Sequence, residues 1–231
     1  MDNSAELQTF KIVIIGDSYT GKTSLAYRLC TGKFYEKLET TIGVDFFQKI
    51  VNINDERVKI QVWDSAGQER FRKSMTVHYY RNVDAIVFVY DITSEPSFQS
   101  LTLWVEEYKH YTIPDKVVKI LIGTKSDLTE SKRVETNVAR KFAEQYGMPF
   151  YEVSSKNDGD KQTIETIFSS VAEKLQKEKP VVLKRARVLN KSGSLQSRGS
   201  EKSATLEKNV TLKDEKEKLE KEKKKCCGSG S

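Results

Sequence analysis

The feature that most constrains the fold of this 231-residue chain is a glycine-containing loop that directly follows an apolar stretch. Residues 16–23 read GDSYTGKT and match the pattern G-x-x-x-x-G-K-[ST], between a β-like run at residues 11–15 and a helical pattern at residues 23–30. In this context, backbone N–H groups of the loop and of the helix N-terminus surround a phosphate group. Lys22 is expected to bridge the β and γ oxygens, and the Thr23 hydroxyl to bind Mg²⁺. The motif predicts phosphate binding and leaves kinases, ATPases and GTPases open.

Strand-like and helical stretches alternate along the chain after this loop. Further strands are expected at residues 44–53, 57–63, 85–90, 117–122 and 150–153, and further helices at residues 97–110, 135–146 and 162–175. The first two of these strands are expected to form a hairpin through Asn54, Asp55 and Glu56. Because the other strands are apolar throughout, we expect an α/β fold. Its six-stranded sheet is mostly parallel and has helices on both faces and one antiparallel edge strand, residues 44–53.

Charge is distributed unevenly along the chain. The whole sequence has 39 Lys and Arg against 33 Asp and Glu, a net charge of +6. Residues 184–231 hold 14 basic and 7 acidic residues, a net charge of +7, whereas residues 1–183 hold 25 basic and 26 acidic residues, a net charge of −1. The basic excess therefore lies in the C-terminal segment, and nucleic acid is not an expected partner of the folded part.

These patterns divide the chain into three parts. We expect a flexible N-terminus at residues 1–8, a globular domain at residues 9–178 and a disordered basic tail at residues 179–231. The tail has too few apolar residues to offset the entropy lost on ordering. No apolar run approaches the roughly 18 residues of a membrane span, and the start of the chain lacks the pattern of a secretory signal. We therefore expect a reducing, cytosolic compartment. The chain is expected to be a monomer.

A second motif stands at the end of the third expected strand, where residues 64–68 read DSAGQ. Beside a phosphate-binding loop, Asp64 is expected to hold a Mg²⁺-bound water, and the Gly67 N–H to face a γ-phosphate oxygen. Gln68 is expected to orient an attacking water. Thr41, in a loop ahead of the edge strand, is expected to give Mg²⁺ a second hydroxyl ligand when the γ-phosphate orders that loop. A D-x-x-G sequence alone is also common in strand-end turns.

Base selectivity is expected from residues 124–127 (TKSD), which follow the strand at residues 117–122. A buried carboxylate at Asp127 accepts from the ring N–H and the exocyclic amine of guanine together, and adenine offers neither donor in that arrangement. Two charge-assisted hydrogen bonds of about 1.5–3 kcal/mol each favour GTP over ATP by about 3–6 kcal/mol. The Lys125 stem is expected to cover one face of the base, and residues 154–156 (SSK) to offer backbone N–H groups to the guanine carbonyl.

Taken together, these segments resemble the five nucleotide motifs of Ras-type small GTPases over about residues 9–178. The resemblance implies a Ras-like P-loop NTPase fold with Mg²⁺ and bound GTP or GDP. It implies Gln68 and Lys22 as catalytic residues, and the spacing from Lys22 to Phe34 implies that Phe34 stacks on guanine. The implied metal ligands are Thr23, Thr41 and Asp64. The residues implied to bind the nucleotide are Ser18, Tyr19, Thr20, Gly21, Lys22, Thr23, Ser24, Phe34, Thr41, Gly67, Thr124, Lys125, Asp127, Ser154, Ser155 and Lys156.

Within this superfamily the chain is most similar to the Rab branch, and most like the Golgi-associated Rab thirty-three subfamily. The resemblance rests on residues 42–46 (IGVDF), 79–81 (YYR) and 89–93 (VYDIT), and the stretch 70–75 (RFRKSM) points to the subfamily. It implies a switch in vesicle trafficking that recruits effectors in the GTP state. The implied effector-binding residues are Ile42, Gly43, Val44, Asp45, Phe46, Trp63 and Tyr79. Phe46, Trp63 and Tyr79 are equally compatible with an ordinary core.

Four positions depart from the family's pattern. Thr124 replaces the usual Asn, whose amide bonds the base and the P-loop, although Rho-type relatives also use Thr. Ser65 in place of Thr and Ser155 in place of Ala are mild changes. At Tyr19 the family commonly has Gly or Asn, residues that accept a positive φ at little cost. We expect about 1 kcal/mol of backbone strain there, expressed as weaker nucleotide retention.

The C-terminal tail contains two adjacent cysteines, Cys226 and Cys227, after three lysines at residues 223–225. This arrangement resembles the double geranylgeranylation site of Rab proteins. Two prenyl chains and a basic run together give stable membrane anchoring. The implied location is the cytosolic face of endomembranes, the Golgi in particular, in exchange with the cytosol. The implied partners are an exchange factor, a GTPase-activating protein, a GDP-dissociation inhibitor, an escort protein and effectors.

The sequence leaves two other functions open. A nucleotide-locked effector-binding module with little intrinsic hydrolysis is favoured only by Tyr19 and Ser65. A small-molecule P-loop kinase needs a lid for its acceptor substrate, and the sequence has no Arg-rich insertion of that kind. No Arg is positioned in cis for catalysis, so hydrolysis is expected to be slow without an activating protein that supplies one.

Overall fold

A computed structural model describes residues 7–66, 79–112 and 117–178. These residues belong to a compact unit, residues 1–186, and residues 187–231 fall in a second unit outside the described residues. The strands are β1 (Gln8–Ile15), β2 (Val44–Ile53), β3 (Glu56–Ser65), β4 (Ala85–Asp91), β5 (Val118–Thr124) and β6 (Phe150–Glu152). The α-helices are α1 (Lys22–Thr31), α3 (Glu95–Gln99), α4 (Leu101–Tyr111), α5 (Thr136–Gln145) and α6 (Lys161–Glu178), and two 3₁₀ turns lie at Thr129–Ser131 and Asp158–Asp160.

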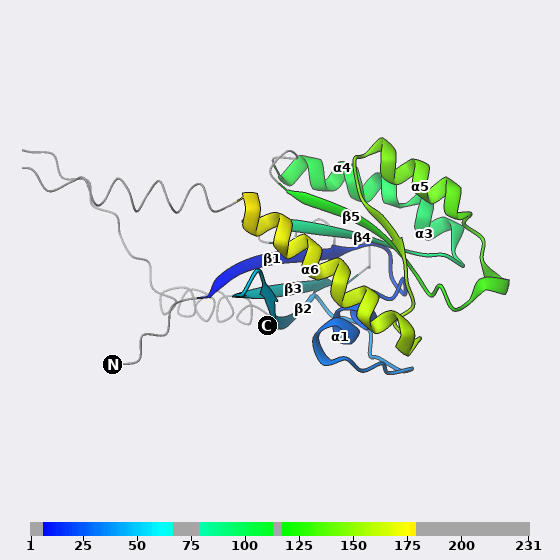
Figure 1. Cartoon of the computed structure of the whole chain (residues 1–231). Coiled ribbons are helices and arrows are strands. Elements are labelled where there is room, and N and C mark those ends of the chain that lie inside the picture. The colour runs from blue at the N-terminus through cyan, green and yellow to red at the C-terminus, as the bar shows by residue number, and fades with distance from the viewer. Residues whose placement is uncertain (1–6, 67–78, 113–116, 179–231) are drawn as a thin grey trace, which may run out of the picture. The chain divides into compact units, whose positions relative to one another are not determined.

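The strands form one sheet in the order β2-β3-β1-β4-β5-β6 (Figure 1). β2 pairs antiparallel with β3, and each remaining pair of neighbours is parallel. The α/β fold expected from the sequence is therefore confirmed, including the antiparallel edge strand. In this topology the carboxyl ends of β1, β3, β4, β5 and β6 lie along one edge of the sheet, where open α/β sheets bind ligands.

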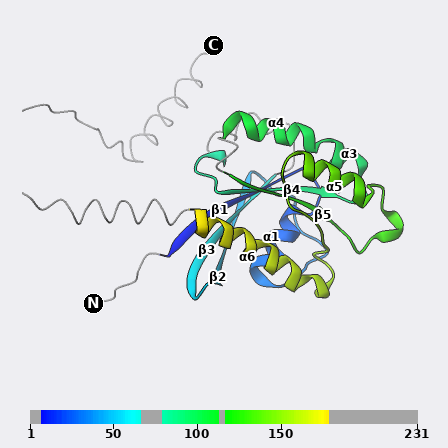
Figure 2. The same ribbon diagram turned by 45° about the horizontal axis from the view of Figure 1, so that its top comes forward.

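Two apolar layers hold helices against the two faces of the sheet. Helices α1 and α6 cover one face, where Leu25 and Phe168 are buried, and helices α3, α4 and α5 cover the other, where Trp104 and Ala139 are buried (Figure 2). β4 is buried along its whole length because it is covered on both faces. Within the described part of the chain, no helix combines the length and apolar character needed to cross a bilayer.

The hairpin between β2 and β3 turns at two residues rather than the three expected. Asn54 (φ 49°) and Asp55 (φ 64°) both adopt the left-handed conformation, which is typical of a two-residue hairpin turn. Glu56 already pairs with Ile53, the last residue of β2. Asn and Asp tolerate this conformation better than most residues, so the sequence suits the tighter turn.

The helix expected at residues 97–110 is instead two consecutive helices, α3 and α4, that meet at Ser100. α3 starts two residues earlier than expected because Ser94 caps it by accepting from the Ser97 N–H, and Pro96 occupies the first turn. The other expected elements are present, with ends that differ by up to three residues.

Candidate nucleotide-binding site

The phosphate-binding loop between β1 and α1 passes so close to β4 that only glycine fits at its start. Gly16 has φ 149°, and a Cβ atom there would lie 2.1 Å from the carbonyl oxygen of Val89. Gly21, just before α1, is also left-handed with φ 85°. These two glycines let the backbone turn from the end of β1 into α1.

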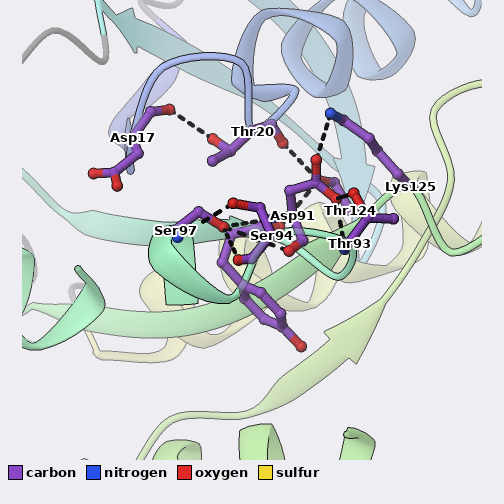
Figure 3. Close-up of polar contacts among 9 residues, drawn as sticks. Asp17, Thr20, Asp91, Thr93, Ser94, Ser97, Thr124 and Lys125 are labelled. Carbon is purple, nitrogen blue, oxygen red and sulfur yellow. Dashed lines mark hydrogen bonds and ion pairs between the residues drawn. The ribbon is translucent and has the colours of Figure 1, made fainter. Parts of the chain in front are cut away.

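Hydrogen bonds within the loop and from two other elements, α4 and β5, fix this loop, and Figure 3 draws those of Thr20 and Thr124. The Thr20 hydroxyl donates to the Asp17 carbonyl at 2.9 Å, and Trp104 of α4 donates its indole N–H to the Asp17 carboxylate at 2.9 Å. The Thr124 hydroxyl, at the end of β5, lies 2.5 Å from the Thr20 carbonyl oxygen and 3.0 Å from that of Tyr90. Thr124 therefore bonds the P-loop although it lacks the amide of Asn.

Lys22 begins α1 and is buried in the pocket beneath the loop. Its ammonium group donates to the Asp17 carbonyl at 2.7 Å. Burial lowers the pKa of Lys22 to about 8, and the nearby carboxylates of Asp64 and Asp17 partly oppose this shift. A buried cation in this position is suited to bind an anion.

Three oxygen-bearing side chains that are far apart in the sequence meet beside Lys22. The Thr23 hydroxyl donates to Asp64 Oδ2 at 2.6 Å and lies 2.9 Å from the Thr41 hydroxyl. The Thr41 hydroxyl donates to the same Asp64 oxygen at 3.2 Å. Thr23 comes from the first turn of α1, Thr41 from the loop before β2, and Asp64 from the end of β3. The predicted metal ligands are therefore brought together.

One carboxylate oxygen of Asp64 has no hydrogen-bond partner within the residues that the structure describes and is suited to bind a cation. Its Oδ1 atom is buried and has no hydrogen-bond partner among the described residues. Burial raises the pKa of Asp64 to about 6, although hydrogen bonds from Thr23 and Thr41 and the charge of Lys22 act in the other direction. Buried orphan oxygens are uncommon, and hard oxygen ligands of this kind fit Mg²⁺.

At the opposite end of the pocket, Asp127 and Ser154 form a second polar cluster. The Ser154 hydroxyl donates to Asp127 Oδ1 at 2.5 Å, and the Ser154 N–H donates to Asp160 Oδ2 at 2.7 Å. The expectation that Asp127 is buried is wrong, because its side chain is exposed on the pocket wall. Asp127 belongs to the turn after β5, in which the Leu128 N–H donates to the Lys125 carbonyl, and this turn faces the open pocket.

Lys125 lines the pocket directly after Thr124. Its ammonium group bonds to Asp91 Oδ2 at 2.5 Å, and the other oxygen of Asp91 accepts from the N–H and hydroxyl of Thr93 (Figure 3). This buried carboxylate holds the head of the lysine, while the rest of the side chain lines the pocket. The arrangement is compatible with the expected contact between the Lys125 stem and a base.

Tyr19 has the unfavourable backbone conformation that its sequence position predicts. Its φ is 63°, in the left-handed region, and the residue is 81% exposed at the rim of the pocket. A non-glycine residue in this region costs about 1–2 kcal/mol. The exposed side chain has few contacts that can offset this cost.

Most of the predicted binding residues line one cavity of about 400 Å³, a volume typical of small-molecule sites. Thr20 is an exception because its side chain is buried and turned toward Asp17. Gly67 and Gln68 lie outside the described residues, as do Cys226 and Cys227. The predicted residues that line the cavity are Ser18, Tyr19, Gly21, Lys22, Thr23, Ser24, Phe34, Thr41, Thr124, Lys125, Asp127, Ser154, Ser155 and Lys156.

The loop between α1 and β2 supplies pocket residues that sequence reasoning missed. Tyr35 packs edge-on against Tyr27 of α1 with ring centroids 5.1 Å apart, and Glu36 forms an exposed ion pair with Lys156 at 3.4 Å. The adjacent aromatic residues Phe34 and Tyr35 are the signal that could have identified this wall. The missed lining residues are Tyr35, Glu36, Leu38, Glu39, Thr40, Ser65 and Leu128.

The three aromatic residues predicted to face partners differ in exposure. Phe46 is exposed on β2 and packs edge-on against the partly buried Trp63, with ring centroids 5.5 Å apart. Tyr79 is buried in the core, and its hydroxyl lies 2.8 Å from the Trp63 carbonyl oxygen and 3.0 Å from that of Ile14. Ile42, just ahead of β2, is 93% exposed. The surface beside β2 therefore includes Ile42 and Phe46, while Tyr79 supports it from beneath.

A phosphate-binding loop of this kind, at the end of the first strand of a mostly parallel sheet, defines the class of P-loop nucleotide-binding proteins. A model of the Ras family matches residues 11–177. The chain therefore belongs to the Ras family of small GTPases, within its Rab branch. Membership implies guanine-nucleotide binding, GTP hydrolysis and, in general terms, regulators and effectors.

Named relatives agree with the branch predicted from the sequence. The chain is 48% identical over 186 residues to Ras-related protein Rab-33A of Mus musculus, which covers 80% of this chain and 78% of the relative. It is 46% identical over 176 residues to Ras-related protein Rab-33 of Caenorhabditis elegans, a match that covers 75% of this chain and 57% of the relative. It is 44% identical over 169 residues to Ras-related protein Rab-30 of Homo sapiens, a match that covers 73% of this chain and 81% of the relative. The predicted similarity to the Rab thirty-three subfamily is confirmed.

Proposed function

We propose that this chain is a Mg²⁺-dependent GTP-hydrolysing switch of the Rab type that acts in vesicle trafficking, with the Golgi as its compartment. The observation that carries the proposal is the arrangement of one cavity. An oxygen cluster with a buried lysine lies at one end, and the Asp127 carboxylate, bonded to the Ser154 hydroxyl, lies at the other. This arrangement matches the phosphate groups and the base of a guanine nucleotide.

At the phosphate end, the chain's own residues would bind and orient the triphosphate. Lys22 and the P-loop N–H groups bind phosphate oxygens, and Thr23, Thr41 and Asp64 hold Mg²⁺. The bound metal ion offsets negative charge on the phosphate oxygens. Thr41 belongs to the loop that also lines the base end, so this loop has a means to respond to the γ-phosphate.

At the base end, Asp127 would accept two hydrogen bonds from guanine. The Ser154 hydroxyl bonds to one Asp127 oxygen and so orients the carboxylate. Charge-assisted hydrogen bonds of this type are worth about 1.5–3 kcal/mol each. Adenine lacks the matching pair of donors, so this end selects GTP over ATP.

Hydrolysis would require a water oriented by Gln68, with Gly67 donating to the γ-phosphate. Among the described residues no arginine lines the cavity. Slow intrinsic hydrolysis follows, and a GTPase-activating protein would supply the missing cation. In single-turnover assays, Gln68→Leu is expected to slow the intrinsic rate. A Gln68→Leu rate equal to that of the parent would remove Gln68 from the catalytic residues.

The tail and the surface beside β2 would connect the switch to its surroundings. Prenylated Cys226 and Cys227, with the preceding lysines, would anchor the chain to the cytosolic face of endomembranes. A GDP-dissociation inhibitor and an escort protein would handle the lipidated form, and an exchange factor would load GTP. In cell fractionation, the Cys226→Ser/Cys227→Ser variant is expected in the soluble fraction. A variant as membrane-bound as the parent would contradict lipid anchoring.

The most direct test is to identify the nucleotide that copurifies with the chain. We expect GDP or GTP in a one-to-one ratio with protein after denaturation and chromatography. Single-turnover hydrolysis with and without an activating protein then separates a switch from a nucleotide-locked binding module. A copurifying adenine nucleotide would overturn the proposal.

A further inference from the structure

Arg28 is a charged residue in the buried face of α1. Its side chain is only 3% exposed and lies on the helix face of Leu25 and Leu29, which belong to the apolar layer under the sheet. An arginine remains protonated in proteins, and a buried cation is costly unless it is paired and hydrogen-bonded. The partners of Arg28 therefore indicate why it is tolerated.

Those partners come mainly from one loop far along the chain. Arg28 Nε donates to the Ser155 carbonyl at 2.6 Å, and Nη2 donates to the Lys156 carbonyl at 3.1 Å. Nη1 donates to the Gly32 carbonyl at 2.9 Å and lies 2.8 Å from Asp158 Oδ1. Asp158 is 92% exposed, so the ion pair contributes little, and the carbonyl contacts are the main feature of the site.

The loop held by Arg28 contains one backbone donor without a partner. The Ser154 N–H donates to Asp160 Oδ2, and the Lys156 N–H donates to Ser154 Oγ at 3.1 Å. In the described part of the chain, the Ser155 N–H has no hydrogen-bond partner. Ser155 nevertheless lines the nucleotide cavity. The Asn157 N–H also donates to Ser154 Oγ, at 3.1 Å, so among the backbone donors of residues 154–157 the Ser155 N–H alone remains for a ligand.

We propose that Arg28 is a positioning residue for guanine recognition. By holding the Ser155 and Lys156 carbonyls, it fixes the Ser155 N–H so that it donates to the carbonyl oxygen of guanine. Arg28 does not itself line the cavity, so it acts through the loop and not by touching the base. This inference rests on the proposed function, because it assigns a donor to the guanine carbonyl within the same pocket.

A matched control separates this role from general stabilisation of α1. Lys49 also reaches the C-terminal end of α1, where its ammonium group donates to the Leu29 carbonyl at 2.8 Å and pairs with Glu165 at 2.8 Å. None of these contacts involves the loop of Ser155. Lys49→Met therefore removes a partly buried cationic contact at the same helix end without releasing the loop of Ser155.

The experiment compares the full chain with Arg28→Met and Lys49→Met in competition binding against a fluorescent GDP. The competitors are GTP, 6-thio-GTP and ITP. The sulfur of 6-thio-GTP is a weak acceptor for the Ser155 N–H, whereas ITP keeps the carbonyl and lacks the amine that Asp127 binds. We expect Arg28→Met to weaken GTP binding about tenfold and to lose most of the preference for GTP over 6-thio-GTP. Its preference for GTP over ITP is expected to equal that of the parent, and Lys49→Met is expected to keep both preferences.

An unchanged preference for GTP over 6-thio-GTP in Arg28→Met would overturn the inference, whatever its stability. If Arg28→Met does not fold, Arg28→Lys serves instead, since one ammonium group cannot span the carbonyls that the guanidinium fork reaches. If Arg28→Lys kept the parent's preference for GTP over 6-thio-GTP, the inference would be overturned. A parent chain with no preference for guanine nucleotides would contradict the proposed function. This result is distinct from the loss of the Arg28 inference, which concerns the variants alone.

Discussion

The two ends of the cavity are assembled in different ways. At the predicted phosphate end, most of the lining residues belong to one stretch, residues 18–24, which contains the left-handed Gly21. At the base end, the groups come from the turn after β5 and the loop after β6, and α1 supplies the buried Arg28 that holds this loop. The phosphate end is therefore a local structure, whereas the base end depends on contacts between distant parts of the chain.

This difference separates affinity from selectivity. Every nucleoside triphosphate carries the same phosphate groups, so a change at Lys22 should affect all of them alike. A change at Asp127 or Arg28 should alter the choice among bases. We therefore expect substitutions at the phosphate end to cause the largest losses of nucleotide affinity.

The largest expected effect is at the phosphate end. Lys22→Ala removes the buried cation that binds phosphate oxygens, and we expect the affinities for GTP and ITP to fall by about 100-fold or more, in equal proportion. Isothermal titration with each nucleotide measures both losses. Lys33→Ala, an exposed lysine that does not line the cavity, is the control. A Lys22→Ala protein that loses GTP binding but keeps ITP binding would break the comparison.

At the base end, Asp127→Asn keeps the shape of the side chain and removes its charge. We expect GTP affinity to fall by about 100-fold, because two charge-assisted hydrogen bonds are lost and the new amide donor faces the donors of guanine. XTP has a carbonyl in place of the amine, so its affinity should rise relative to that of GTP. Asp55→Asn, in the hairpin turn, is the isosteric control. Parallel losses for GTP and XTP would contradict base recognition by Asp127.

Among the groups of the phosphate end, we expect pH to change the Mg²⁺ affinity through Asp64. Burial raises the pKa of Asp64 to about 6, so below that pH Mg²⁺ must displace a proton from the carboxylate. We expect Mg²⁺ affinity in the presence of nucleotide to fall about tenfold for each pH unit below 6. Above pH 7, where Asp64 is ionised, this dependence should disappear. An equally steep dependence above pH 7 would show that another group controls metal binding.

The same pKa predicts how the stability of the nucleotide-free protein depends on pH. Because the folded state holds the Asp64 proton more tightly than the unfolded chain, stability from this residue is present below about pH 4 and is lost as pH rises to about 6. Thermal melting of the parent should show this loss, and Asp64→Asn should not. Identical pH profiles for the two proteins would contradict the raised pKa.

The smallest expected effect concerns Tyr19. Tyr19→Asn relieves about 1 kcal/mol of strain in the left-handed region, so GDP release should slow by about fivefold. Release of a fluorescent GDP after mixing with excess GTP gives the rate. Tyr19→Phe keeps the strain and should release GDP as the parent does. A Tyr19→Asn rate equal to that of the parent would rule out strain as a cause of weak retention.

Sequence reasoning succeeded where the relevant contacts are local. The P-loop and the alternating strands and helices were predicted from short stretches, and the left-handed backbone at Tyr19 from the resemblance of that loop to the family's. The role of Arg28 was not, because its partners lie 127 and 128 positions away and no local pattern pairs them. Its one sequence signal is a charged residue on the apolar face of a helix, beside Leu25 and Leu29.

The exposure of Asp127 was also missed, for a related reason. An acidic residue after a buried strand suggests burial, but the turn at the end of β5 leads the chain out of the sheet and onto the wall of an open cavity. Likewise, the division between α3 and α4 depends on how Ser94 and Pro96 start a separate first helix. Burial and helix continuity depend on the surrounding chain, which a local pattern does not specify.

The bond between Trp104 and Asp17 gives the protein a built-in optical probe. The chain has two tryptophans. Trp104 donates to the P-loop carboxylate, and Trp63 adjoins Asp64, with the Lys11 ammonium 4.1 Å from its ring centroid. Indole emission is sensitive to hydrogen bonding and to nearby charge, so both tryptophans are placed to sense rearrangement of the phosphate end. We therefore expect that nucleotide loading and release can be followed in real time through ultraviolet fluorescence of the unlabelled chain.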